Sequence, residues 1–193
     1  MCFATGFVTV VTVPAKDGEG EGAGERIVGG ALWLQPGQKM EPSLTTFVRI
    51  SPWKAIWSWG LSALSRLFLK YTPTIEKTLD KAFGARGVDR LDSWHLFEIA
   101  VDPDWEGQGL CSLLVRDGFA RATPKPIHLE ATTPKSRDRY LHFGFEIDEE
   151  HRFGVGEVDE KGLPAKGEAA VGWPDVVMTK VRLRARCGAG GVD

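Results

Sequence analysis

The sequence predicts a single domain of the α/β class, in which strands and helices follow one another along the chain. Segments rich in β-branched or apolar residues are bounded by turn residues, as is typical of strands. Between them, apolar residues recur at intervals of three and four, the spacing of amphipathic helices. A chain of 193 residues suits one domain, and 42% hydrophobic residues are enough for a core.

Two strands are expected near the start, over residues 7–13 and 26–34. The first is rich in valine and threonine, and the second stops at Pro36-Gly37. Between them, residues 17–25 are acidic and glycine-rich, with too few apolar side chains to pack. This arrangement predicts a hairpin with a long, flexible loop.

Residues 52–84 are expected to be helical. Apolar residues spaced by 4, 3, 4 and 3 form a stripe, and packing into the core is favoured over a membrane or partner surface. Thr72-Pro73 then offers an N-cap and a first-turn proline, and Gly84 can close a second helix. The stripe consists of Trp57, Leu61, Leu64, Phe68 and Tyr71, and the apolar side of the second helix of Ile75, Leu79 and Phe83.

The second half of the chain alternates between strands and helices. A polar connector, 87–92, leads to a largely apolar and central strand. Leu110, Leu113 and Leu114 are expected on one side of the helix that follows it. The predicted strands are 94–101, 126–131, one that begins at 145–147, and 175–183; the predicted helices are 110–122 and 136–143, with a polar loop at 154–174.

The segment Val101–Ser112 carries the strongest functional signal. A strand passes through a turn with Gly107 and Gly109 into the start of a helix. Free backbone N–H groups and the helix dipole favour a pyrophosphate there, and glycines let phosphate oxygens approach closely. The segment lacks both the G-K-[ST] end of a P-loop and the third glycine of a dinucleotide fingerprint.

Three landmarks resemble those of the GNAT superfamily of N-acetyltransferases, in the subgroup with a helical insertion before the cofactor strand. The acyl-CoA motif Q/R-x-x-G-x-G/A falls on residues 106–111: Gly109 matches, Glu106 replaces Gln or Arg, and Cys111 replaces Gly or Ala. Residues 140–145 resemble Y-x-x-x-G-F, and residues 31–37 resemble A-x-W-L-x-P-G. The resemblance covers roughly residues 27–147.

This resemblance implies a mixed, mostly antiparallel central sheet flanked by helices. It implies one domain over residues 1–183 with a helical insertion at about 52–84, followed by a disordered tail at 184–193. The family's N-terminal strand-helix-helix unit is expected to be reduced or missing. Whether the helices at 52–84 substitute for this unit, or the acceptor pocket is damaged, is left open.

The resemblance also implies a function: transfer of acetyl from acetyl-CoA to the amine of a small molecule, through a tetrahedral intermediate. Tyr140 occupies the position of the family's general acid, and residues 99–101 that of its oxyanion donors. The base is left open between His95, Glu98 and water; His128 and His142 are weaker candidates because neither has an identifiable partner. The expected cofactor-binding residues are Ile99, Ala100, Val101, Glu106, Gly107, Gln108, Gly109, Leu110, Cys111, Ser112 and Tyr140.

Composition restricts the partners. The net charge of −2 gives no basic footprint for nucleic acid. Three scattered cysteines, Cys2, Cys111 and Cys187, fit neither a disulfide framework nor a zinc site, so the sequence predicts a cytoplasmic setting and no metal. No membrane span is expected, and a homodimer is left open. The alternatives are a non-catalytic acyl-CoA-binding or scaffold domain and a surface-binding module that uses Trp53, Trp57 and Trp59.

Overall fold

The computed structural model describes residues 6–15, 24–37, 57, 60–62 and 64–181. Within this part of the chain, the predicted order of strands and helices is confirmed. The strands are β1 (Gly6–Pro14), β2 (Glu25–Leu34), β3 (Trp94–Val101), β4 (Ile127–Ala131), β5 (Glu146–Phe153) and β6 (Trp173–Lys180). The helices are α3 (Thr72–Ala85), α4 (Leu110–Ala122) and α5 (Pro134–His142).

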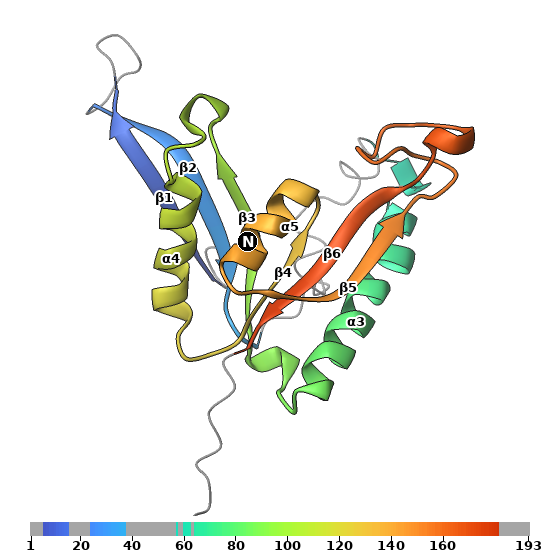
Figure 1. Ribbon diagram of the computed structural model, residues 1–193, viewed down its shortest axis with the longest axis horizontal. Helices are drawn as coiled ribbons and strands as arrows, with labels where there is room; N and C mark the ends of the chain where they lie inside the picture. Colours follow the sequence, from blue (N-terminus) through green and yellow to red (C-terminus); the bar gives the residue numbers. More distant parts are fainter. Residues whose placement is uncertain (1–5, 16–23, 38–56, 58–59, 63, 182–193) are drawn as a thin grey trace, which may run out of the picture.

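The six strands form one sheet in the order β1-β2-β3-β4-β6-β5. All neighbours are antiparallel except β3 and β4. That parallel pair is joined only at Trp94–Ile127 and His95–His128, after which the strands separate and the sheet opens into a V (Figure 1). The predictions of a mostly antiparallel mixed sheet and of a central β3 are therefore confirmed.

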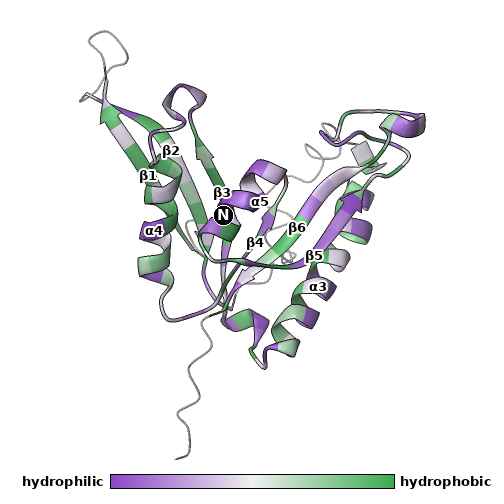
Figure 2. Cartoon of the chain, viewed as in Figure 1, coloured by the Kyte–Doolittle hydropathy of each residue, from purple (hydrophilic) through white to green (hydrophobic). Residues whose placement is uncertain are grey.

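Helices cover both faces of the sheet. Successive residues of a strand point to opposite faces of the sheet, so the contacts of β6 show which face each helix covers. Val176 and Met178 pack in the larger buried cluster with residues of α4 and α5, whereas Val177 packs in a second cluster with residues of α3. Helices α4 and α5 thus cover one face and α3 the other. Figure 2 shows the contrast between the hydrophobic β1 to β3 and the largely hydrophilic edge strand β5.

Helix α4 lies close against the first strands because of a glycine. A Cβ atom at Gly118 would overlap the indole ring of Trp33 on β2, which is fully buried. The helix also contacts β1 and β3. This close approach places α4 directly against β2.

Helix α3 buries its predicted apolar side, Ile75, Leu79 and Phe83. Its start differs from the prediction, because a π-helical turn, Leu67–Tyr71, runs directly into it. Thr72 is therefore not an N-cap: its hydroxyl donates to the Leu67 carbonyl at 3.0 Å. Pro73 lies in the first turn as expected.

The predicted end of α3 is also corrected. Gly84 lies inside the helix, which continues to Ala85. Gly87 takes up the left-handed conformation that ends the helical path, with φ of 65°. Glycine is preferred where φ is positive, so Gly87 fulfils the role predicted for Gly84.

The aromatic stripe before α3 does not pack in the core as predicted. Trp57 is 94% exposed, Leu61 71% and Phe68 41%. Tyr71 is half-buried and its ring lies 5.0 Å from that of Phe153. The prediction is wrong for the first three, whose side chains are exposed, whereas α3, which follows them, packs against β5 and β6.

One predicted core position on α4 is exposed. Leu114 is 2% exposed and Leu110 is half-buried, but Leu113 is 56% exposed. Leu110 and Leu114 are four residues apart and share a helix face, whereas Leu113 lies about 100° around the helix from Leu114. Leu113 therefore lies off the buried face of the helix, at a surface groove that residues of β1 also line.

The last two strands differ in extent from the predictions. β5 continues to Phe153 although only its first residues were predicted, since an edge strand can carry the charged residues that obscured it. β6 begins at Trp173. Most of the acidic loop at 17–25, the start of the helical insertion, the tail at 184–193 and Cys2, Cys187, Trp53 and Trp59 lie outside the described residues. Among the described helices, none is both long and apolar enough to cross a bilayer.

Candidate functional site

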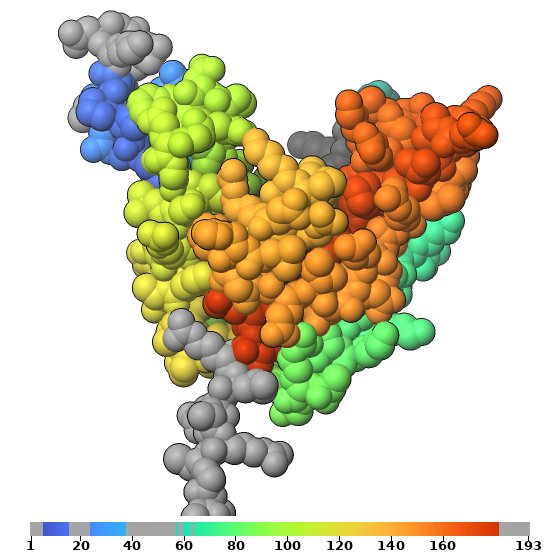
Figure 3. All heavy atoms as spheres, in the orientation of Figure 1, coloured from blue at the N-terminus to red at the C-terminus, as the bar shows by residue number. Residues whose placement is uncertain are grey.

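A first pocket lies between the end of β3, the glycine turn and α5, and has a volume of about 460 Å³. In Figure 3 the surface is notched between the yellow-green turn before α4 and the golden α5. Of the described residues predicted to bind the cofactor, all but Gln108 line this pocket. They are Ile99, Ala100, Val101, Glu106, Gly107, Gly109, Leu110, Cys111, Ser112 and Tyr140.

The glycine turn presents backbone donors to this pocket. Gly107 and Gly109 have φ of 78° and 81°, a region that other residues enter only with strain. The first helical bond of α4 runs from the Leu113 N–H to the Gly109 carbonyl. The N–H groups of the preceding residues 110–112 therefore have no acceptor within the helix and are available to an anion.

Two cations of α5 line the same pocket. Lys135 Nζ lies 2.7 Å from Glu106 Oε2, and its hydrogen bond and charge lower the pKa of this exposed carboxylate. Arg139 follows four residues later, on the same helix face. Lys135 thus offsets the negative charge that Glu106 brings to the turn. The sequence interpretation missed both cations, although their i, i+4 spacing beside Tyr140 was a usable signal.

Tyr140 is buried beside the turn. Its side chain is 7% exposed, and its ring packs edge-on against Phe145 at 5.7 Å. Burial is the main cause that raises the pKa of the Tyr140 hydroxyl to about 12, with a smaller contribution from Cys111. The phenol therefore keeps its proton at neutral pH and can donate it.

A second pocket, of about 400 Å³, lies on the α3 face of the sheet. His95 and Phe97 of β3 and Glu130 of β4 line it, opposite side chains of α3. Thr132 lines this pocket and Thr133 the first one. Adjacent residues that follow β4 therefore line the two pockets.

A β-bulge changes the predicted orientation of Glu98. Trp33 pairs with Leu96, but Leu32 pairs with Glu98, which leaves Phe97 as an extra residue. Paired residues share a face, so Glu98 lies on the same face as Leu32, opposite Trp33 and Leu96. A regular strand would place His95 and Glu98, three residues apart, on opposite faces, but the bulge places both on the same face. Glu98 is exposed, and it is not one of the residues that line either pocket.

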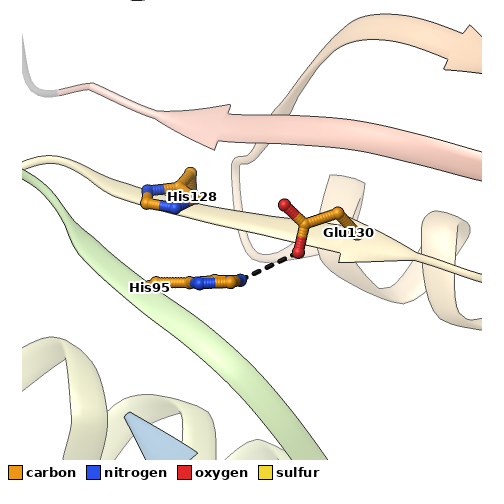
Figure 4. Close-up of side chains that lie close together, drawn as sticks. All are labelled: His95, His128 and Glu130. Atoms are coloured by element: carbon orange, nitrogen blue, oxygen red, sulfur yellow. Dashed lines mark hydrogen bonds and ion pairs between the residues drawn. The ribbon is translucent and has the colours of Figure 1, made fainter. Parts of the chain in front are cut away.

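His95, His128 and Glu130 lie together at the second pocket (Figure 4). His95 Nε2 is 2.8 Å from Glu130 Oε2, and the two imidazole rings are stacked with centroids 4.4 Å apart. The Ser93 hydroxyl lies 2.9 Å from His128 Nδ1. Burial lowers the pKa of His128 well below its usual value, so this ring is neutral.

Two sequence interpretations change at this cluster. His128 was expected to have no identifiable partner, but it contacts Ser93 and His95. Glu130 was not predicted at all. The signal that could have found it is alternation: polar His128 and Glu130 fall on one face of β4, between apolar residues that face the other.

The cluster contains the ligand types of a metal site, with one ligand atom from each residue within 4.8 Å of the others. However, the planes of His95 and His128 differ by only 21°. Lone pairs that lie in nearly parallel, stacked rings do not converge on one point. The observed arrangement therefore favours hydrogen bonding and proton transfer over metal coordination.

Asp175 is a further buried carboxyl group, and its charge interacts with that of Glu130. Its side chain is fully buried, and burial, with help from the charge of Glu130, raises its pKa to about 7. The Tyr71 hydroxyl lies close enough to lower this pKa. However, neither Asp175 oxygen meets hydrogen-bonding geometry with any described residue. A negative charge on Asp175 is therefore poorly stabilised.

Comparisons with known proteins agree on the fold. No protein-family model matches the sequence, and no curated protein matches it either. Among solved structures, arylalkylamine N-acetyltransferase 2 from Aedes aegypti superposes with a TM-score of 0.51 at 19% identity, over 88% of this chain and 72% of that one.

Two further structures superpose less well. A mosquito arylalkylamine N-acetyltransferase-like 5b has a TM-score of 0.49 at 22% identity, over 82% of this chain and 70% of that one. A structure described as histone acetyltransferase HPA2 and related acetyltransferase, from Corynebacterium glutamicum, has a TM-score of 0.47 at 24% identity, over 95% of this chain and 68% of that one. The strand order, the glycine turn and the superposition on the Aedes aegypti enzyme together show that the chain has the fold of the GNAT N-acetyltransferases.

Proposed function

We propose that the chain is an N-acetyltransferase that moves acetyl from acetyl-CoA to the amine of a small molecule. The observation that carries this proposal is the first pocket. It combines two left-handed glycines, the unpaired N–H groups at the start of α4 and the buried phenol of Tyr140. The turn would hold the diphosphate, and Tyr140 would lie near the sulfur.

The reaction forms one C–N bond and breaks one C–S bond. An alkylammonium, with a pKa near 10.4, must first lose a proton. The neutral amine then attacks the thioester carbon, and the tetrahedral intermediate expels the CoA thiolate. Tyr140 gives this thiolate its proton and later regains one, while the nitrogen loses a second proton on forming the amide. The products are the amide, CoA thiol and one proton released to solvent.

Residues 99–101 would stabilise the oxyanion. They line the first pocket on the part of β3 that no longer pairs with β4. Backbone N–H groups at such a position can donate to the developing negative charge. Lys135 and Arg139 add positive charge on the α5 side of the same pocket, which would favour the phosphates.

His95 is the proposed base, with Glu130 as the partner that orients its ring. A histidine held by a carboxylate is a common means of proton removal at neutral pH. Glu98 shares this face but is exposed outside both pockets, so it would act only through water. Helix α3 lines the second pocket and would form one wall of the acceptor site.

The acceptor is proposed to be a small amine, in line with the arylalkylamine N-acetyltransferase on which the chain superposes. The proposed setting is cytoplasmic, without a metal ion or nucleic acid. A non-catalytic acyl-CoA-binding or scaffold domain is the alternative, because Glu106 occupies the position where the family motif has Gln or Arg. Incubation with acetyl-CoA and a broad amine panel, read as the mass gain of one acetyl group, separates the two. An acetylated product supports the enzyme, and binding without any product supports the alternative.

A further inference from the structure

The second pocket combines apolar walls with a few charged side chains. Ile75 and Leu79 of α3, Leu67 of the π-helical turn and Phe97 of β3 supply apolar walls. A volume of about 400 Å³ is in the range of small-molecule sites. Such walls favour a ligand whose body is apolar, because polar groups placed against them would lose their hydrogen bonds to water.

Most of the pocket's charges are already paired. Arg90 is the single lysine or arginine among the described lining residues. It lies 2.7 Å from Asp80 and 3.7 Å from Glu76. The lining carboxylate of Glu76 therefore has a cationic partner, and a second ligand cation would have to compete with Arg90 for it.

Of the carboxylates that line the pocket among the described residues, Glu130 pairs with a histidine, which is charged only when protonated, and not with a lysine or arginine. Its side chain is 13% exposed, against 32% for Glu76, and it pairs with His95. His128, stacked on His95, is neutral because burial lowers its pKa. Asp175 lies close enough for its charge to oppose that of Glu130. A buried carboxylate in this setting is stabilised by one additional cation.

We propose that the second pocket takes a hydrophobic primary monoamine, with its ammonium group at Glu130 and His95 and its apolar body between α3 and Phe97. This inference rests on the proposed acetyl transfer, for which it names the acceptor class. The ammonium donates to the Glu130 carboxylate. Because His95 Nε2–H also donates to this carboxylate, Nδ1 is the His95 atom that can receive the proton that the amine must lose. Diamines and polyamines are disfavoured, because their second charge would lie against the apolar wall.

The test is calorimetric titration of the full chain, without cofactor, using three probes. These are 2-phenylethylamine, its uncharged analogue 2-phenylethanol, and 1,4-diaminobutane. The amine is expected to bind about tenfold to a hundredfold more tightly than the alcohol, the range of a hydrogen bond to a charged group. The diamine is expected to bind more weakly than the monoamine. Equal affinity for amine and alcohol, or tighter binding of the diamine, overturns the proposal.

Two variants and a control locate the preference. Glu130→Gln should bind amine and alcohol alike, whereas Glu168→Gln, which removes an exposed carboxylate that does not line the pocket, should behave as the wild type. Leu67→Lys places a cation at a position that is already 38% exposed, so it should fold even where Glu130→Gln does not. It should weaken the amine at least tenfold and spare the alcohol. Unchanged amine binding in Leu67→Lys contradicts the assignment.

The titration tests the acceptor class independently of cofactor binding. Because no acetyl-CoA is present in the titration, loss of the amine preference overturns the acceptor class alone. Failure of acetyl-CoA to bind in a separate titration overturns the proposed acetyl transfer while the amine result is still measured.

Discussion

His95 Nε2 lies 2.8 Å from Glu130 Oε2, across two strands that run parallel and then separate. The contact joins side chains 35 residues apart in sequence, at the side of the sheet opposite the glycine turn. A proton acceptor is thereby fixed on the α3 face, while Tyr140 offers a proton on the other face. The proposed acid and base thus approach the reacting atoms from opposite faces.

Replacing His95 tests the base. His95→Gln keeps a polar group near Glu130 but removes the titratable ring, so kcat should fall on the order of 10²-fold with acetyl-CoA affinity unchanged. His142→Gln, an exposed position at the end of α5, is the matched control and should leave kcat unchanged. Steady-state kinetics at saturating acetyl-CoA measure both. Equal kcat in the two variants would remove His95 from the proton path.

Tyr140→Phe tests the acid. The ring and its packing against Phe145 are retained, and only the hydroxyl is lost. Cofactor affinity should stay within about twofold, while kcat falls on the order of 10²-fold. Single-turnover measurements keep the chemical step visible. A normal single-turnover rate would leave Tyr140 with a packing role only.

Asp175 makes stability depend on pH. Its pKa is about 7 in the folded chain against an ordinary 3.8, so the folded state holds more protons between these values. Stability should therefore fall as pH rises from about 4 to 7, by at most roughly 1.4 kcal/mol for each pH unit. Asp175→Asn should flatten this slope, whereas Asp117→Asn, at a surface ion pair, should not. Urea unfolding at several pH values measures the slopes, and identical slopes in both variants would contradict the assignment.

Two glycine substitutions test the packing of the helices. Gly118→Ala should destabilise the fold by about 1–3 kcal/mol or more, because the new methyl group overlaps the ring of Trp33. Gly84→Ala, in α3 with no atom near the new Cβ, should stabilise it by about 0.5–1 kcal/mol. Thermal unfolding of both variants decides the matter. A neutral Gly118→Ala would mean that α4 lies farther from β2.

Local patterns predicted much of the fold from sequence. The boundaries of β3 and α4 agree with the prediction, because each is delimited by turn residues and holds a clear apolar pattern. The glycine turn was recognised for the same reason: its chemistry depends on consecutive residues. Whether an apolar stripe is buried depends on tertiary contacts, so the pattern alone wrongly predicted that Trp57 packs in the core.

The acceptor side could not be predicted in the same way. The pairing of His95 with Glu130 depends on the parallel register of β3 and β4, which no local pattern specifies. The face of Glu98 depends on a single-residue bulge at Phe97. One inserted residue reverses the alternation of a strand, so a regular strand gave the wrong face.

Binding of acetyl-CoA to two matched glycine variants tests the central claim. Gly109 and Gly156 have φ of 81° and 83°, and neither has an atom within 4 Å of an added Cβ. Gly109→Asp and Gly156→Asp should therefore lose similar stability from backbone strain, but only the first places a charge beside the expected diphosphate. Repulsion of about 1–4 kcal/mol corresponds to roughly 5- to 1000-fold in Kd. Calorimetry should show weakened binding in Gly109→Asp and wild-type binding in Gly156→Asp, and equal Kd values in the two folded variants would contradict the phosphate-binding turn.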